Sequence, residues 1–205
     1  MIAAYIQSTA PETRSSYIEL PTTRENIRQN LDALGVSDQV GYRICALESC
    51  NNNTLDGCLF GMDKTGVTLE EVNFLAYRLE NLGQNDAEIY EGLLILHSPE
   101  SVKDMINLTA NLNGEIYFVP EIQTTKDLGG FLIENGFVEI PQEYWKYLDY
   151  AAIGEEHLAY HTAAITNNGY IEDGHLPEEM IEIYDGKKLP EIEWPEQNMG
   201  QEMSF

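Results

Sequence analysis

Basic residues are scarce in this chain. Only 11 Lys and Arg residues stand against 35 Asp and Glu among 205 residues, which gives a formal net charge of −24. Such an excess of one sign disfavours direct binding to nucleic acid or to an anionic membrane, because both are polyanions. It favours a basic groove or a cation as partner, although many proteins are acidic for solubility alone.

Long apolar runs are also missing. No stretch approaches the roughly 20 apolar residues that a membrane span needs, and the N-terminal MIAAYIQST lacks the basic and apolar regions of a leader peptide. We therefore expect a cytoplasmic protein with no membrane partner. Because 43% of the residues are hydrophobic, the chain should fold around a core rather than stay disordered.

The usual signatures of catalysis and cofactor binding are absent. Cys45, Cys50 and Cys58 are odd in number and irregularly spaced, which predicts reduced, partly buried thiols rather than a disulfide framework or a zinc site. No Gly-rich phosphate loop and no EF-hand loop occur. The sequence thus predicts neither an enzyme nor a cofactor.

One histidine pair has the spacing of metal ligands. His157 and His161 lie four residues apart on an expected helix, but the residues between them lack the Glu of an H-E-x-x-H motif, and no third ligand is evident. We therefore expect an ordinary half-buried pair and no metal site. An expected loop at Glu172-Asp173-Gly174 only faintly resembles a calcium-binding turn.

Periodicity and capping signals predict an α+β fold made of three small domains. The expected units are an N-terminal α+β domain at 1–63, a central helical domain at 64–113, a C-terminal α+β domain at 114–185, and an extended or mobile tail at 186–205.

Within the first two domains, capping boxes mark the helices. Thr22 with Glu25 should begin one helix and Thr68 with Glu71 another, while Ser98 should cap a helix over 102–112. The asparagine run at 51–53 predicts a turn. In the third domain we expect a strand at 115–119 and helices at 125–135 and 141–150.

The negative charge is concentrated towards the C-terminus. Residues 127–205 contain 17 acids and 3 bases, and acids recur at intervals of about four to six residues on or beside the expected helices: Glu134, Glu139, Glu143, Asp149, Glu155 and Glu156. Carboxylates spread over an extended surface could imitate the phosphates of a DNA strand. The same spacing also fits the solvated face of any acidic helix.

Aromatic residues are interleaved with these acids. Tyr144, Trp145 and Tyr147 lie close together on the expected helix 141–150. Aromatic side chains are enriched at protein interfaces, so this helix is a candidate dimer interface. Burial of the same side chains in the chain's own core is the alternative.

Several motifs together resemble the ArdA antirestriction proteins of bacterial mobile elements. The strongest match is Glu139-Ile-Pro141 followed by Tyr147-x-Asp149-Tyr150-x-Ala152-x-Gly154. The segments 17–21, 72–79 and 169–171 add to the resemblance, which runs over most of residues 1–173.

That resemblance implies an elongated, curved homodimer of three-domain protomers whose carboxylates follow the path of bent DNA. It implies a non-catalytic decoy that fills the DNA-binding groove of type I restriction-modification enzymes, contacting their specificity and methyltransferase subunits, and so protects incoming DNA. Two protomers would carry a formal −48, about the phosphate charge of 24 base pairs. The alternative is an acidic adaptor or regulatory protein that binds one basic DNA-processing partner.

Overall fold

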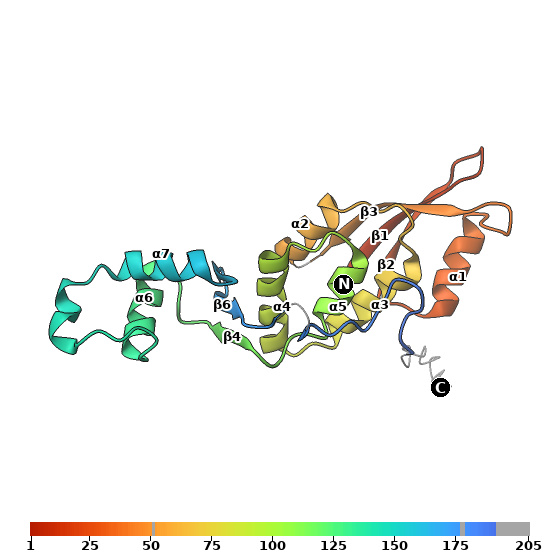
Figure 1. Cartoon of the computed structure of the whole chain (residues 1–205). Coiled ribbons are helices and arrows are strands. Elements are labelled where there is room, and N and C mark those ends of the chain that lie inside the picture. Colours follow the sequence, from red (N-terminus) through yellow and green to blue (C-terminus); the bar gives the residue numbers. More distant parts are fainter. Residues whose placement is uncertain (51, 177–178, 192–205) are drawn as a thin grey trace, which may run out of the picture. The chain divides into compact units, whose positions relative to one another are not determined.

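The computed structural model describes residues 1–50, 52–176 and 179–191 of the chain (Figure 1). It is a mixed α+β protein with two small antiparallel sheets, which confirms the predicted class. Contacts divide the chain into two compact units: unit 1 comprises Met1–Leu82, Pro99–Thr109 and Glu182–Phe205, and unit 2 comprises Gly83–Ser98 and Ala110–Ile181. The three-domain division stays a prediction, because the segment expected as its central domain is shared between both units.

Unit 1 is built on a three-stranded sheet of order β2-β1-β3. Its strands are β1 (Ile2–Ser8), β2 (Ser15–Leu20) and β3 (Tyr42–Ser49), and β1 pairs with both neighbours in antiparallel register (Figure 1). Around the sheet pack α1 (Arg24–Ala33), α2 (Asn53–Gly61) and α3 (Leu69–Glu80), and α5 (Val102–Leu108) packs on α3. Burial of one face of the sheet under helices forms the core of this unit.

Helix α3 connects most parts of unit 1. It begins at the predicted capping box of Thr68 and Glu71, and the side chains from Leu69 to Ala76 include six buried ones. Asn73 is fully buried, but its side chain accepts from the Thr22 amide at 2.7 Å and donates to the Thr22 carbonyl at 2.9 Å. Because both the oxygen and the nitrogen of the Asn73 side chain are hydrogen-bonded, the cost of burying this side chain is offset. The two bonds also tie α3 to the turn between β2 and α1.

Several predicted boundaries in this part of the chain are wrong, and the helix expected over 102–112 ends as α5 at Leu108. Asn52 and Asn53 begin α2 instead of a turn, because the Asn52 side chain accepts from the Leu55 amide at 2.8 Å and caps the helix; Asn51 lies outside the described residues. Thr23, not Thr22, caps α1. Ser101, not Ser98, caps α5, since Ser98 ends the preceding helix in the left-handed conformation with φ 44°.

The cysteine prediction is correct in part. The three thiols are free, but Cys45 and Cys50 are exposed, and only Cys58 is half-buried. Burial raises the pKa of the Cys58 thiol. In addition, no helix in the described residues is long and apolar enough to cross a membrane.

A segment after the second unit returns to unit 1. The Tyr184 side chain is 4% exposed, and its hydroxyl donates to Glu71 on α3 at 2.8 Å. The Asn107 side chain of α5 pairs with both backbone groups of Tyr184 at 2.9 Å. Of the predicted tail at 186–205, residues 192–205 lie outside the described part of the chain.

Unit 2 has a second sheet, of order β4-β6-β5, between two groups of helices. The strands are β4 (Ile116–Val119), β5 (Ala163–Thr166) and β6 (Gly169–Asp173), and the helices are α4 (Gln84–His97), α6 (Thr125–Glu134), the 3-10 helix η1 (Gln142–Tyr147) and α7 (Tyr150–Tyr160). Helix α4 contacts β5 and β6, and α6 packs along α7 (Figure 1).

Two further predictions fail in unit 2. The single helix expected at 141–150 is interrupted, because Leu148 is extended and Asp149 begins the separate helix α7. Glu172 and Asp173 belong to strand β6 rather than to a loop. Both are therefore held by the sheet, and as strand neighbours they point to opposite faces.

Glycines allow α6 and α7 to approach closely. A Cβ added at Gly129 would lie 1.9 Å from the Tyr150 carbonyl oxygen, and one added at Gly154 would lie 2.0 Å from the Thr125 carbonyl oxygen. The two helices thus touch backbone to backbone. Beside this contact, Ile122, Leu128, Leu132 and Tyr170 form the buried core between the helices and β6.

Gly129→Ala should destabilise unit 2 by about 2 to 3 kcal/mol, because a backbone oxygen cannot move aside as a flexible side chain can. Gly130→Ala is the matched control, since nothing lies within 4 Å of a Cβ at this neighbouring helical position. It should be neutral or stabilise by up to about 1 kcal/mol through helix propensity. Urea unfolding of both variants tests this; equal stability of the two would disprove the close contact.

Tyr184 should make the stability of unit 1 sensitive to alkaline pH. Burial, followed by the bond to Glu71, raises the pKa of Tyr184 to about 12, whereas an unfolded tyrosine has a pKa near 10. The neutral phenol therefore contributes stability below about pH 10 that is lost as pH rises to 12. The unfolding free energy of Tyr184→Phe should fall less between pH 9.5 and 11.5 than that of the parent; parallel curves would contradict the assignment.

Candidate functional site

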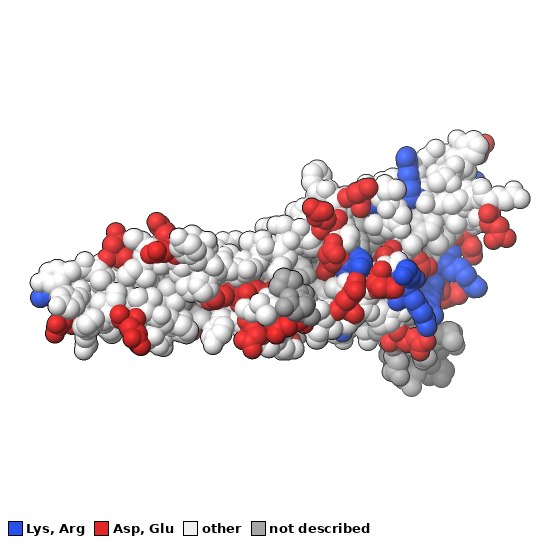
Figure 2. Space-filling view, viewed as in Figure 1, with Lys and Arg blue, Asp and Glu red and all other residues white. Residues whose placement is uncertain are grey.

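Unit 2 carries an excess of carboxylates that its own bases cannot neutralise. Its sequence contains 16 acidic residues against only Lys126 and Lys146, a net charge of −14 with histidines neutral. The two lysines of this unit can therefore neutralise only two of its carboxylate charges. Figure 2 shows acidic side chains scattered among uncharged ones on the face drawn.

All six predicted partner-binding acids lie on the surface of unit 2. They come from successive elements: Glu134 ends α6, Glu139 lies between α6 and η1, Glu143 is in η1, Asp149 caps α7, and Glu155 and Glu156 are on α7. Each is exposed. Sequence reasoning missed four further exposed acids of this unit because they lie outside the motif region: Glu115, Glu121, Asp127 and Glu179.

Two of these surface acids also have a structural role. The Asp149 side chain accepts from the Ala152 amide at 3.2 Å and caps α7. Asp127 accepts from the Thr124 hydroxyl at 2.7 Å while the Asp127 amide donates back to that oxygen, and this bond lowers the pKa of Asp127. The remaining five predicted acids make no such cap.

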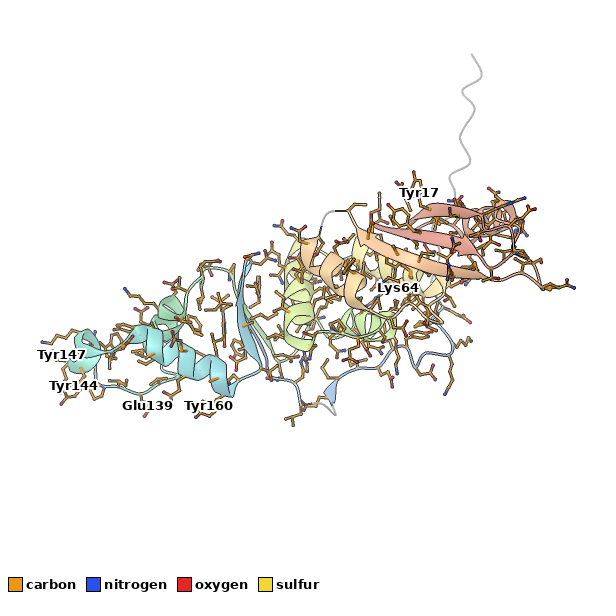
Figure 3. All side chains as sticks on the ribbon, turned by 90° about the horizontal axis from the view of Figure 1, so that it is seen from above. Tyr17, Lys64, Glu139, Tyr144, Tyr147 and Tyr160 are labelled. Atoms are coloured by element: carbon orange, nitrogen blue, oxygen red, sulfur yellow. The ribbon has the colours of Figure 1, made fainter. Side chains whose placement is uncertain are left out.

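The three predicted interface aromatics differ in exposure. Tyr144 is 53% and Tyr147 is 74% exposed, whereas Trp145 is half-buried and its indole N–H donates to the Ile140 carbonyl at 2.9 Å. Three more aromatic side chains of this unit, Tyr117, Phe137 and Tyr160, are 54%, 57% and 82% exposed. In Figure 3 the labelled Tyr144, Tyr147, Glu139 and Tyr160 lie along the edge of the cyan helical part.

The histidine pair acquires a third polar partner in the fold. Residues four apart on a helix share one face, and the rings of His157 and His161 stack with centroids 3.9 Å apart. Strand β6 brings Glu172 to them: one carboxylate oxygen lies 3.3 Å from His157 Nε2, and the other lies 2.8 Å from His161 Nδ1. The Tyr170 hydroxyl donates to the same carboxylate and lies 2.8 Å from His157 Nε2.

The charge state of Glu172 follows from these contacts. Its partial burial alone would raise the pKa of the carboxyl, but the bonds from Tyr170, His157 and His161 outweigh burial and hold it below its usual range. Burial first, and then the bond to Glu172, raises the pKa of the Tyr170 phenol far above its usual value. Tyr170 therefore stays a neutral donor and Glu172 a carboxylate.

The other two histidines of the chain bind the neighbouring acid. Asp173 is buried on the opposite face of β6; one of its oxygens lies 2.7 Å from His97 Nε2 and the other 2.8 Å from His175 Nδ1. The His175 amide donates to Asp173 as well. Although burial alone would raise the pKa of Asp173, these bonds lower it.

Comparison with known proteins assigns no family to the chain. No model of a known protein family matches the chain, and no curated protein is significantly similar to it in sequence. The resemblance to the ArdA proteins therefore rests on the motifs alone.

Asp149→Ala should destabilise unit 2 by about 1 kcal/mol, because the cap of α7 is lost. Asp149→Asn keeps an acceptor oxygen at the same place and should cost only a few tenths of a kcal/mol. Chemical unfolding of the two variants separates the capping role of Asp149 from its surface charge. An Asn variant as unstable as the Ala variant would show that the charge, not the cap, is what stabilises the fold.

Proposed function

We propose that this chain is a non-catalytic DNA mimic of the ArdA type. It occupies the DNA-binding groove of a type I restriction-modification enzyme and so protects incoming mobile DNA. The observation that carries the proposal is the surface of unit 2, where ten exposed carboxylates are accompanied by only two lysines. The motifs of segment 139–154 add the resemblance to a family of such decoys.

The electrostatic argument has two parts. Duplex DNA presents about one negative charge per 1.7 Å, so a formal −24 corresponds to roughly 40 Å of duplex. A basic groove that normally binds DNA would release counterions on binding this surface, which favours fast association and makes affinity fall as salt rises. No single carboxylate is essential in such an interaction.

Dimerisation is part of the proposal. The arrangement of three domains in an elongated homodimer is implied by the resemblance. The exposed Tyr144 and Tyr147 of η1 offer apolar area with little loss of rotamer freedom. We infer that they contribute to the dimer. The half-buried Trp145 between them fixes η1 to the preceding segment through its bond to the Ile140 carbonyl.

A distributed substitution tests the acid surface. Glu134, Glu139, Glu143, Glu155 and Glu156 changed together to Gln remove five charges without touching a cap. The quintuple variant should displace labelled duplex DNA from a purified type I methyltransferase core at least tenfold less well at moderate salt, whereas each single variant should change displacement less than threefold. Full displacement by the quintuple variant would rule out this surface.

The matched control removes five exposed acids from unit 1. Glu12, Glu19, Asp32, Asp38 and Glu80 make no side-chain hydrogen bond or ion pair among the described residues. Their joint change to the amides gives the same net charge. It should weaken displacement clearly less than the change in unit 2; an equal loss would mean that total charge, rather than the unit 2 surface, determines binding.

The same assay separates the decoy from the adaptor. A DNA-shaped decoy should displace DNA from several unrelated type I enzymes, with weaker competition at higher salt. An adaptor should bind one basic DNA-processing partner and leave those enzymes on their DNA. Displacement from none of several enzymes at low salt would therefore replace the decoy with the adaptor.

A further inference from the structure

The cluster of His157, His161 and Glu172 has the composition of a transition-metal site. Two imidazoles and one carboxylate form a ligand set that zinc uses in proteins, with three protein ligands and a fourth position left for water. The three residues come from two elements, the C-terminal end of α7 and strand β6, both within unit 2. Their ligand atoms all lie within 4.8 Å of one another.

The distances suit a small divalent cation. With bonds of about 2.0–2.1 Å in a tetrahedral site, neighbouring ligand atoms lie about 3.3 Å apart. Here the two imidazoles lie against different oxygens of Glu172: His157 Nε2 is 3.3 Å from one and His161 Nδ1 is 2.8 Å from the other. Ligand atoms within 4.8 Å of one another can close on one ion when the exposed His161 side chain and the carboxylate rotate.

The surroundings of the cluster resemble those of a metal site too. The Tyr170 hydroxyl lies on the same face of β6, 2.8 Å from His157 Nε2, and donates to the Glu172 carboxylate, which orients that carboxylate as outer partners of metal ligands do. The His161 side chain is 45% exposed, whereas those of His157 and Glu172 are 14% and 22% exposed. An ion can therefore enter from solvent on the His161 side.

We propose that His157, His161 and Glu172 form a binding site for Zn²⁺ or a similar divalent transition metal. The ion takes the place of the hydrogen bonds between the two imidazoles and the carboxylate, and each imidazole ligates in its neutral form, with its N–H on the ring nitrogen that does not face the ion. Bound metal joins the end of α7 to β6. This inference does not depend on the proposed function, because it concerns the chemistry of unit 2 alone.

The histidines of the opposite face provide the control. His97 also lies at the end of a helix and also pairs with a carboxylate of β6, but its partner is Asp173. His97→Gln removes one imidazole from the same unit without touching the proposed ligands. A comparison with this variant separates specific binding from the general affinity of exposed histidines for zinc.

The experiment is a calorimetric titration at pH 7.5, in which ZnCl₂ is added to the untagged full-length chain after a chelator has removed any bound metal. We expect one Zn²⁺ per chain for the parent and for His97→Gln. Binding should weaken at least tenfold in His161→Gln and in Glu172→Gln. The exposed His161 should be replaceable without unfolding, which circular dichroism of the variant checks. Absence of saturable binding in the parent, or equal affinity in His161→Gln, would overturn the proposal.

Thermal unfolding gives a second readout. A ligand that binds only the folded state raises its stability with concentration. Zinc at 100 μM should raise the melting temperature of the parent and of His97→Gln but not that of His161→Gln. An equal shift in all three proteins would indicate adventitious surface binding and would also overturn the site.

Discussion

Strand β6 is the element on which unit 2 depends. Because side chains alternate along a strand, Tyr170 and Glu172 face one group of helices while Ile171 and Asp173 face the other. On the first side Tyr170 belongs to the core with α6. On the second side Ile171 packs so closely on α4 that a Cβ at Gly92 would lie 2.5 Å from it. A shift of the strand by one residue would exchange both faces and bury the wrong side chains.

The two acids of this strand explain why the four histidines of an otherwise acidic chain gather in one unit. Buried carboxylates are costly without hydrogen-bond donors, and both lysines of unit 2 are exposed on its surface. Histidines from α4, α7 and the chain after β6 serve instead. Unit 2 therefore uses carboxylates in two ways: those of β6 are paired and hold elements together, whereas those on α6, η1 and α7 are exposed.

The sequence predicted the elements whose signals are local. The capping box at Thr68, the strand expected at 115–119 and the helix expected at 125–135 follow from signals within a few residues of one another. Each is present, the strand as Ile116–Val119 and the helix as Thr125–Glu134. The turn expected at Asn52 and Asn53 is wrong because asparagine, which favours turns, also caps helices. Only the apolar residues that follow decide between a turn and a helix. The single helix expected at 141–150 is wrong for a similar reason: η1 ends at Tyr147, and Asp149 caps the new helix α7. Periodicity alone did not show this break.

The acid surface was visible in the sequence, because exposed carboxylates need no long-range partner. The third ligand of the proposed metal site, Glu172, could not be predicted from the sequence. Glu172 lies 11 residues beyond His161, across the β5–β6 hairpin, and only the pairing of these strands turns it towards α7. A histidine pair at helical spacing next to an expected acidic loop was the one available signal, and placing the acids in a loop instead of a strand hid it.

The two proposals place opposite charges on α7, because the decoy uses its carboxylates and the metal site adds a cation. The order of the acids and the metal ligands along the helix reconciles them. A decoy gains from negative charge, and a bound divalent ion subtracts two charges from the same unit. Yet a carboxylate surface resembles DNA only if its spacing is held while a groove closes on it. Glu155 and Glu156 directly precede His157 on α7, so an ion at the end of this helix fixes the acids it carries to the sheet. Two charges among 14 are a small loss, and a fixed helix keeps the remaining charges in place.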